Sequence, residues 1–172
     1  TLKKTGIENI VMLTGDNRGT AQAVALQVGI DDVQSELLPE DKLKLVEQLV
    51  KRYQHVAMVG DGVNDAPALA AASIGIAMGT AGTDAAIETA DIALMSDDLE
   101  KLPWLILHAQ RTLNIIRQNI AFALVVKFIF MALALANLAT LWMAIAADMG
   151  ASLLVILNGL RLLKSVSMKV PV

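Results

Sequence analysis

Two aspartates lie four residues apart in the stretch MVGDGVNDAPAL, which covers residues 58–69. An apolar run ending in glycine precedes Asp61, and an alanine-rich run follows Asp65. Carboxylate oxygens are the ligands that Mg²⁺ prefers, and this ion usually keeps several waters while sharing a phosphate with the protein. Glycines at 60 and 62 let the backbone come close to a ligand. The stretch therefore predicts a turn that holds a cation against an anion.

Two further segments carry groups that suit a phosphate. TGDN (residues 14–17) follows the apolar run IVML, and LPEDK (residues 38–42) opens a helical pattern. Thr14 can donate a hydroxyl hydrogen bond to a phosphate oxygen, and Lys42 can supply a point charge. Each segment alone is also compatible with an ordinary turn, helix start or cap, but the order of all three at strand ends favours a site.

The spacing of apolar residues predicts how these segments are positioned. Short apolar runs typical of strands alternate with helical patterns about ten residues long, and Pro39 suits the first turn of one helix. This alternation predicts an α/β fold with a partial doubly wound parallel sheet. Ligands bind beyond the carboxyl ends of such strands, so we expect Thr14, Asp16, Asp61 and Asp65 to converge on one edge. The predicted strands cover residues 10–13, 33–37, 55–60, 73–78 and 91–95, and the predicted helices cover 19–28, 39–52, a short stretch from 64, and 83–89.

After residue 102 the pattern changes to two long apolar runs, residues 118–138 and 141–160. Each is long enough to cross the hydrocarbon core of a bilayer as a helix, and two residues separate them, which predicts a transmembrane hairpin. Arg111, Arg117, Arg161 and Lys164 flank the outer ends, so the positive-inside rule predicts that both ends are cytoplasmic. The alternative, a core hairpin of a soluble protein, fits less well because both runs exceed ordinary helix lengths.

Charge is distributed unevenly along the 172 residues. Residues 1–100 hold 7 Lys/Arg and 16 Asp/Glu, whereas residues 101–172 hold 7 Lys/Arg and one acid. The acidic first part argues against nucleic acid as a partner, since phosphates select basic surfaces. The chain has no cysteine, which excludes disulfides and thiolate metal sites within it.

Lys127 and Asp148 are the only ionisable residues inside the two apolar runs. Charged residues at this depth are costly and usually face the protein interior along a transport pathway. Counted from the turn near residue 139, their depths differ by roughly 4–5 Å at 1.5 Å per residue, so an ion pair is feasible. Two hypotheses stay open: a structural pair that locks the hairpin, or a carboxylate that binds a transported cation with lysine as its counter-ion.

The three phosphate-site segments, in their order TGDN, LPEDK and MVGDGVNDAPAL, resemble the phosphorylation domain of P-type ATPases, which belongs to the haloacid dehalogenase superfamily. The resemblance implies an ATP-driven pump that works through an aspartyl phosphate, with Mg²⁺ and ATP as cofactors. The catalytic residues that it implies are Thr14, Gly15, Asp16, Lys42, Asn64 and Asp65, with Asp61 and Asp65 as Mg²⁺ ligands.

The chain lacks the DKTGT motif that carries the phosphorylated aspartate in this family. We therefore expect the C-terminal part of a pump, inactive alone, whose partner is the missing N-terminal part with its nucleotide-binding domain. The expected domains are a phosphorylation-domain part (1–96), a linker helix (97–117), two transmembrane helices (118–138 and 141–163) and a cytoplasmic tail (164–172).

Lys127 and the sequence Asp148-Met149-Gly150 resemble the zinc/cadmium/lead class of these pumps, in which Asp148 would bind the transported metal and Lys127 would be its counter-ion. A carboxylate also suits a divalent ion better than Cu⁺, which prefers sulfur ligands. The resemblance thus implies a multi-pass exporter of divalent heavy metals in the cell membrane. The alternatives are a copper pump, a membrane-anchored phosphatase of the dehalogenase superfamily, and a non-catalytic interaction module. His55 and His108 have no partner at ligand spacing and are interpreted as structural or surface residues.

Overall fold

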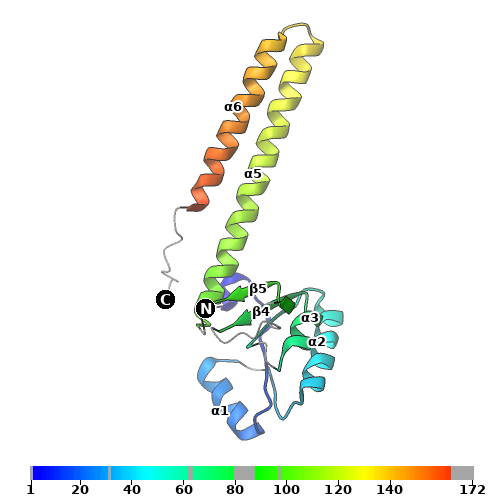
Figure 1. Cartoon of the computed structure of the whole chain (residues 1–172), viewed down its shortest axis with the longest axis vertical. Helices are drawn as coiled ribbons and strands as arrows, with labels where there is room; N and C mark the ends of the chain where they lie inside the picture. Colours follow the sequence, from blue (N-terminus) through cyan, green and yellow to red (C-terminus); the bar gives the residue numbers. More distant parts are fainter. Residues whose placement is uncertain (1, 31, 62–63, 80–87, 97, 164–172) are drawn as a thin grey trace. The chain divides into compact units, whose positions relative to one another are not determined.

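The computed structural model describes residues 2–30, 32–61, 64–79, 88–96 and 98–163 (Figure 1). The chain divides into two compact units. One unit comprises Ile7–Leu99, and the other combines Thr1–Gly6 with Glu100–Val172. Each unit is described by itself below.

The unit Ile7–Leu99 alternates strands with helices, as the spacing of apolar residues predicts. Its strands pair in parallel as β1 with β2 and as β3–β4–β5, which confirms the α/β class with parallel pairing. Among the described residues, backbone hydrogen bonding divides these strands into two groups. Most of the helix predicted over residues 83–89 lies outside the described residues. The elements are β1 (Val11–Leu13), α1 (Arg18–Val28), β2 (Asp32–Gln34), α2 (Pro39–Tyr53), β3 (Ala57–Gly60), α3 (Ala66–Ala71), β4 (Ile74–Met78) and β5 (Ile92–Leu94).

Local sequence signals begin and end these helices. The side chain of Asn17 caps α1 by accepting a hydrogen bond from the backbone N–H of Thr20 at 3.0 Å. Gly29 ends α1 in the left-handed conformation, with φ of 72°, where glycine carries no steric penalty. Pro39 occupies the first turn of α2, where its missing N–H costs no hydrogen bond. These signals fix where α1 and α2 begin, and therefore which residues remain in the loops after β1 and β2.

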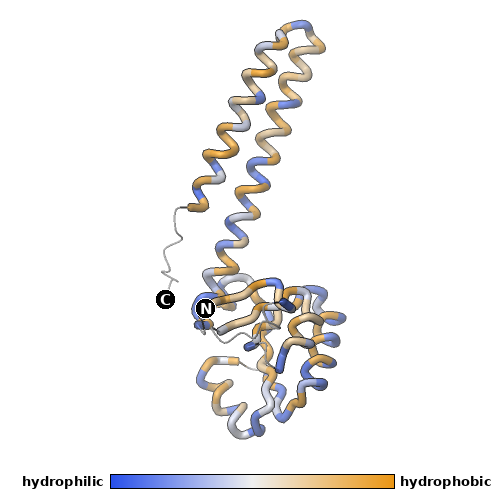
Figure 2. Tube along the Cα trace, viewed as in Figure 1, coloured by the Kyte–Doolittle hydropathy of each residue, from blue (hydrophilic) through white to orange (hydrophobic). Residues whose placement is uncertain are grey.

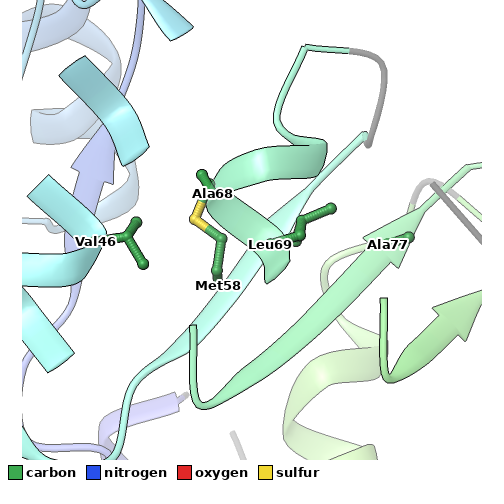
Figure 3. Close-up of a cluster of buried hydrophobic side chains, with 5 residues drawn as sticks. All are labelled: Val46, Met58, Ala68, Leu69 and Ala77. Atoms are coloured by element: carbon green, nitrogen blue, oxygen red, sulfur yellow. The ribbon is translucent and has the colours of Figure 1, made fainter. Parts of the chain in front are cut away.

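A small apolar core holds α2, β3, α3 and β4 together (Figure 3). The side chains of Leu13 on β1 and Val50 on α2 are among those that pack against this cluster. Leu13 ends β1 directly before the TGDN segment, so the core also positions that segment. The buried cluster consists of Val46, Met58, Ala68, Leu69 and Ala77.

The second unit is dominated by two long helices that run antiparallel beside one another (Figure 1). They are α5 (Lys101–Leu135) and α6 (Leu141–Gly159), and the short 3₁₀ helices η1 (Leu2–Thr5) and η2 (Leu160–Leu163) complete the unit. The residues predicted as a linker helix and as the first span thus lie mostly in one continuous helix. At 1.5 Å per residue α5 is about 52 Å long, well beyond the ~30 Å of a bilayer core.

The hairpin has the composition of membrane-spanning helices. The segments Lys101–Leu135 and Leu141–Leu163 are both long and apolar enough to cross a bilayer, and their most apolar windows are not buried within the structure. Figure 2 shows hydrophobic positions along most of both helices, interrupted by isolated hydrophilic ones. An apolar surface of this extent requires lipid or protein around it.

One glycine permits the close packing of β4 against α3. Gly75 is buried, and a Cβ atom at this position would lie 2.8 Å from the backbone oxygen of Leu69. Backbone atoms cannot give way as a flexible side chain can, so this contact excludes larger residues.

We expect Gly75→Ala to destabilise the unit Ile7–Leu99 by ~1–3 kcal/mol, the usual cost of overpacking a core. Hydrogen exchange measured by mass spectrometry on the detergent-solubilised chain tests this. The β4 amides of the variant should be less protected than those of the parent chain. Gly19→Ala is the matched control, because a Cβ there meets only Asn17 Oδ1 at 3.4 Å. Equal protection in the two variants would contradict the packing constraint.

Candidate functional site

The TGDN segment forms a tight loop directly after β1. The hydroxyl of Thr14 donates to Asp16 Oδ2 at 3.0 Å and accepts a hydrogen bond from the backbone N–H of Asp16 at 3.1 Å. A Cβ at Gly15 would lie 3.3 Å from the backbone oxygen of Leu37. Thr14 is half-buried, whereas Gly15 and Asp16 are exposed. The loop therefore holds Thr14 and Asp16 as one hydrogen-bonded pair on an open surface.

Backbone hydrogen bonds join this loop to the segment that leads into α2. The N–H of Leu37 donates to the oxygen of Thr14 at 3.1 Å, and the N–H of Glu36 donates to the oxygen of Asp16 at 2.9 Å. Asp41 then accepts a hydrogen bond from the N–H of Leu38 at 3.3 Å, at the start of α2. TGDN and LPEDK, far apart in sequence, are thus held as neighbours by the main chain.

A salt bridge joins α2 to the beginning of α3. Lys42 Nζ lies 2.7 Å from Asp65 Oδ1, and the two side chains are only 16% and 13% exposed. Asp65 is the N-cap residue of α3, and its backbone oxygen accepts the N–H of Leu69 at 2.8 Å. The structure therefore brings together two predicted site residues that are 23 positions apart.

Gly60 makes room for the Asp65 carboxylate. A Cβ at Gly60 would lie 2.8 Å from Asp65 Oδ2 and 3.0 Å from Asp65 Cβ. We predicted this glycine as a place where the backbone approaches a ligand; the neighbour in the structure is the site's own aspartate. Gly62, the second glycine of that prediction, lies outside the described residues.

Asp61 and Asn64 are the remaining predicted phosphate-site residues. Asp61 follows the last residue of β3, Asn64 precedes Asp65, and both are exposed. Across the described ranges, no three His, Asp or Glu side chains gather as a complete metal-ligand set. One or two carboxylates are nevertheless the usual protein contribution to Mg²⁺, because phosphate and water complete its shell. The exposed Asp61 and the fixed Asp65 fit that donor set.

Lys127 lies on α5 and Asp148 lies on α6, and both side chains are exposed. Within the described part of the chain, no salt bridge joins them. The helices instead meet through Asn119 and Asn158, whose side chains form a hydrogen bond of 2.8 Å. The ion pair therefore stays a prediction.

The sequence analysis missed the asparagine contact and the pairing of Lys42 with Asp65. Asn158 is the one amide in the run 141–160, and that isolation is a signal that could have identified it, whereas Asn119 shares its run with Gln118 and Asn137. The Lys42–Asp65 pair had no such signal, because it depends on how α2 packs against β3 and α3.

Comparisons with known proteins agree with this geometry. Residues 1–73 match the family model of haloacid dehalogenase-like hydrolases. The chain is 59% identical over 163 residues to a probable cadmium-transporting ATPase of Alkalihalophilus pseudofirmus, covering 95% of this chain and 22% of the relative. It is 57% identical, over 95% of its length and 22% of the relative's, to a cadmium-transporting ATPase of Staphylococcus aureus.

The fold also matches a solved structure. A crystal structure of a zinc-transporting PIB-type ATPase in the E2.Pi state superposes with a TM-score of 0.86 and 48% sequence identity, over 95% of this chain and 26% of that one. The present chain thus spans about a quarter of the length of these three proteins.

The Lys42–Asp65 pair can be tested as a coupled unit. Lys42→Met leaves a mostly buried carboxylate without its partner, so we expect a loss of ~1–3 kcal/mol in the stability of this unit, below the range for fully buried pairs. The double variant with Asp65→Asn should lose less than the sum of the single losses, a coupling that hydrogen exchange of α3 measures.

Lys44→Met is the control, since Lys44 is exposed on the same helix. Additive losses in the double variant would contradict a direct interaction between Lys42 and Asp65.

Over nearly its whole length, including the parallel α/β unit and the apolar hairpin, the chain is therefore similar to heavy-metal-transporting P-type ATPases.

Proposed function

We propose that this chain is part of an ATP-driven pump that exports divalent heavy-metal ions, Zn²⁺, Cd²⁺ or Pb²⁺, through an aspartyl-phosphate intermediate. One observation carries the proposal. The same chain that is 57–60% identical to cadmium-transporting ATPases also resembles the zinc-transporting structure in both its phosphate-site unit and its hairpin. The phosphorylated aspartate would be supplied from outside these 172 residues.

In this proposal, Lys42 and Thr14 contact the phosphoryl group. Asp65 holds the Lys42 ammonium at 2.7 Å, so the lysine is positioned before a phosphate arrives. Thr14, now hydrogen-bonded to Asp16, exchanges that bond for one to a phosphate oxygen. Asn64 and Gly15 border the phosphate, and Asp16 lies toward the nucleotide.

Asp61 and Asp65 would hold Mg²⁺. When bound, this ion neutralises charge on the phosphoryl oxygens. Asp65 already shares one oxygen with Lys42 and lies against Gly60, which favours Asp61 as the more accessible ligand. ATP is the proposed phosphoryl donor, bound by another part of the pump.

We place the hairpin in the cell membrane with both ends in the cytoplasm. Arg111, Arg117 and Arg161 lie toward its open end, and the turn between the helices carries no Lys or Arg. Residues 97–117 would link the membrane helices to the phosphorylation-domain part, residues 1–96. Residues 164–172 would form a cytoplasmic tail.

A phosphatase of the dehalogenase superfamily is the alternative from another class. The match to the family model of haloacid dehalogenase-like hydrolases ends at residue 73, whereas the similarity to cadmium-transporting ATPases covers 95% of the chain, including the hairpin. This extent favours the pump. A copper pump is the alternative for the transported ion, and comparing stimulation of the intact pump by Zn²⁺ and by Cu⁺ distinguishes the two.

Asp61→Ala in the intact pump should lower phosphoenzyme formation from labelled ATP and Mg²⁺ by ~10²-fold or more, because a charge-stabilising group at the phosphate is lost. Glu47→Ala, which removes an exposed acid from α2, is the control and should phosphorylate normally. Normal phosphorylation of the Asp61 variant would exclude its role in binding Mg²⁺.

Asp148→Ala should abolish the stimulation of ATP hydrolysis by Zn²⁺, since no other carboxylate lies within the two helices. Ser152→Ala changes another exposed residue of α6, one turn further along the helix, and should retain the stimulation. An equal zinc response in both variants would exclude Asp148 as a ligand of the transported ion. It would not contradict the proposed phosphate chemistry.

A further inference from the structure

The two helices of the hairpin meet along a narrow seam. From residue 119 to the end of α5, the half-buried positions are spaced alternately by four and three residues, the pattern of a helix packed against one neighbour. From residue 144 to residue 158 of α6, the half-buried positions repeat every three or four residues. In these two segments they are Asn119, Ala123, Val126, Phe130 and Leu133 on α5, and Ala144, Ala147, Ala151, Val155 and Asn158 on α6.

A polar cluster closes this seam at its open end. Asn158 Nδ2 donates to Asn119 Oδ1 at 2.8 Å, and Arg161 Nη1 donates to Asn158 Oδ1 at 2.9 Å. Asn119 Nδ2 also reaches the backbone oxygen of Val155 at 3.5 Å, and Arg111 Nη2 reaches that of Arg161 at the same distance. The cluster therefore links both helices through side chains and backbone.

Apolar packing alone does not fix the register of this hairpin. In lipid, helices gain no hydrophobic free energy by associating, and small residues such as Ala123, Ala147 and Ala151 allow neighbouring registers of similar quality. A polar contact behaves differently, because slipping by one turn separates these half-buried amide groups from their hydrogen-bond partners. A single asparagine at a seam position is known to specify register in packed helices.

The register set by this cluster determines the level of the two ionisable residues. Starting from the contact between Asn119 and Asn158, Lys127 lies eight residues along α5 and Asp148 lies ten residues back along α6. At 1.5 Å per residue their levels differ by about 3 Å, less than the roughly 4–5 Å expected from the turn. A slip of one helical turn would change this offset by about 5 Å.

We propose that Asn119, Asn158 and Arg161 form a register lock that keeps the levels of Lys127 and Asp148 in the hairpin within about 3 Å of each other. They are positioning residues: they act through the two helices and contact no transported ion. The functional importance of the levels of Lys127 and Asp148 rests on the proposed function of Asp148. The register of α5 against α6 does not depend on that function.

Disulfide mapping tests the register directly, because the chain has no cysteine of its own. Val126 lies seven residues from Asn119 along α5, and Ala151 lies seven residues from Asn158 along α6, so the two positions are at the same level. A cysteine pair at these positions should therefore oxidise fastest in the full chain in phosphatidylcholine vesicles. Pairs of position 126 with 147 or 155, each displaced by about one turn, should oxidise more slowly. Thiols that remain after oxidation are counted by alkylation and mass spectrometry.

With Asn119→Leu/Asn158→Leu added, the preference for the 126–151 pair should be lost. Asn114→Leu is the matched control, an exposed asparagine on α5, and should keep the preference. Asn119→Asp retains the acceptor for Asn158 and should also keep it. A preserved preference in the double leucine variant overturns the proposal, and so does an equal rate for all three pairs in the parent chain. If the double variant does not insert into the vesicles, Asn158→Leu alone is tested in the same way: loss of the preference for the 126–151 pair supports the proposal, and a preserved preference overturns it.

The intact pump supplies the second readout. The double leucine variant should raise the zinc concentration for half-maximal ATPase stimulation by ~10-fold or more, the usual effect of removing groups that orient metal ligands. A lower maximal rate at an unchanged half-maximal concentration would indicate a merely structural role and overturn the positioning role. If Asp148→Ala retains its zinc response while the disulfide pattern is as expected, the proposed function fails and the register lock stands.

Discussion

The arrangement of the unit Ile7–Leu99 depends on one ion pair, between Lys42 and Asp65. The two charges lie 2.7 Å apart with little exposure, in surroundings where either one alone would be costly. Such a pair adds little net stability compared with apolar packing, but it restricts which arrangements the chain can adopt. Here it requires that the first turns of α2 and α3 face one another, and Gly60 must lack a side chain for the carboxylate to fit.

Backbone hydrogen bonds extend this constraint from α2 to the TGDN loop. The loop that precedes α2 is hydrogen-bonded to Thr14 and Asp16, so the position of Lys42 and that of the TGDN loop are coupled. Val46, on the same helix as Lys42, is completely buried in the core with Met58 and Leu69. Packing thus sets the distance between α2 and α3, and the ion pair then selects the orientation of two side chains at their ends. In the proposed function, this arrangement positions the Lys42 ammonium group before a phosphate binds.

The sequence predicted the parts of this fold that depend on local signals. The glycine after α1, the proline at the start of α2 and the apolar run before Gly60 each act within a few residues, and the elements appear where those signals stand. The partners of individual side chains could not be predicted in the same way. Lys42 was expected to serve a phosphate, and its salt bridge to Asp65 became visible only when α2 and α3 were placed side by side. The division of strand pairing between β1–β2 and β3–β4–β5 likewise depends on tertiary packing.

In the hairpin, which we propose to lie in lipid, a polar contact again selects one arrangement of packed helices. Counting residues from the turn gave an approximate level for Lys127 and Asp148, but helices of nearly uniform apolar surface can slide past one another at little cost. The hydrogen bond between Asn119 and Asn158 breaks that uniformity, because an amide has few alternative partners among leucines and alanines. In both units, therefore, a polar contact selects one arrangement from several that apolar packing would allow. The difference is what each contact holds in place: the Lys42 ammonium group in one unit, and the relative level of Lys127 and Asp148 in the other.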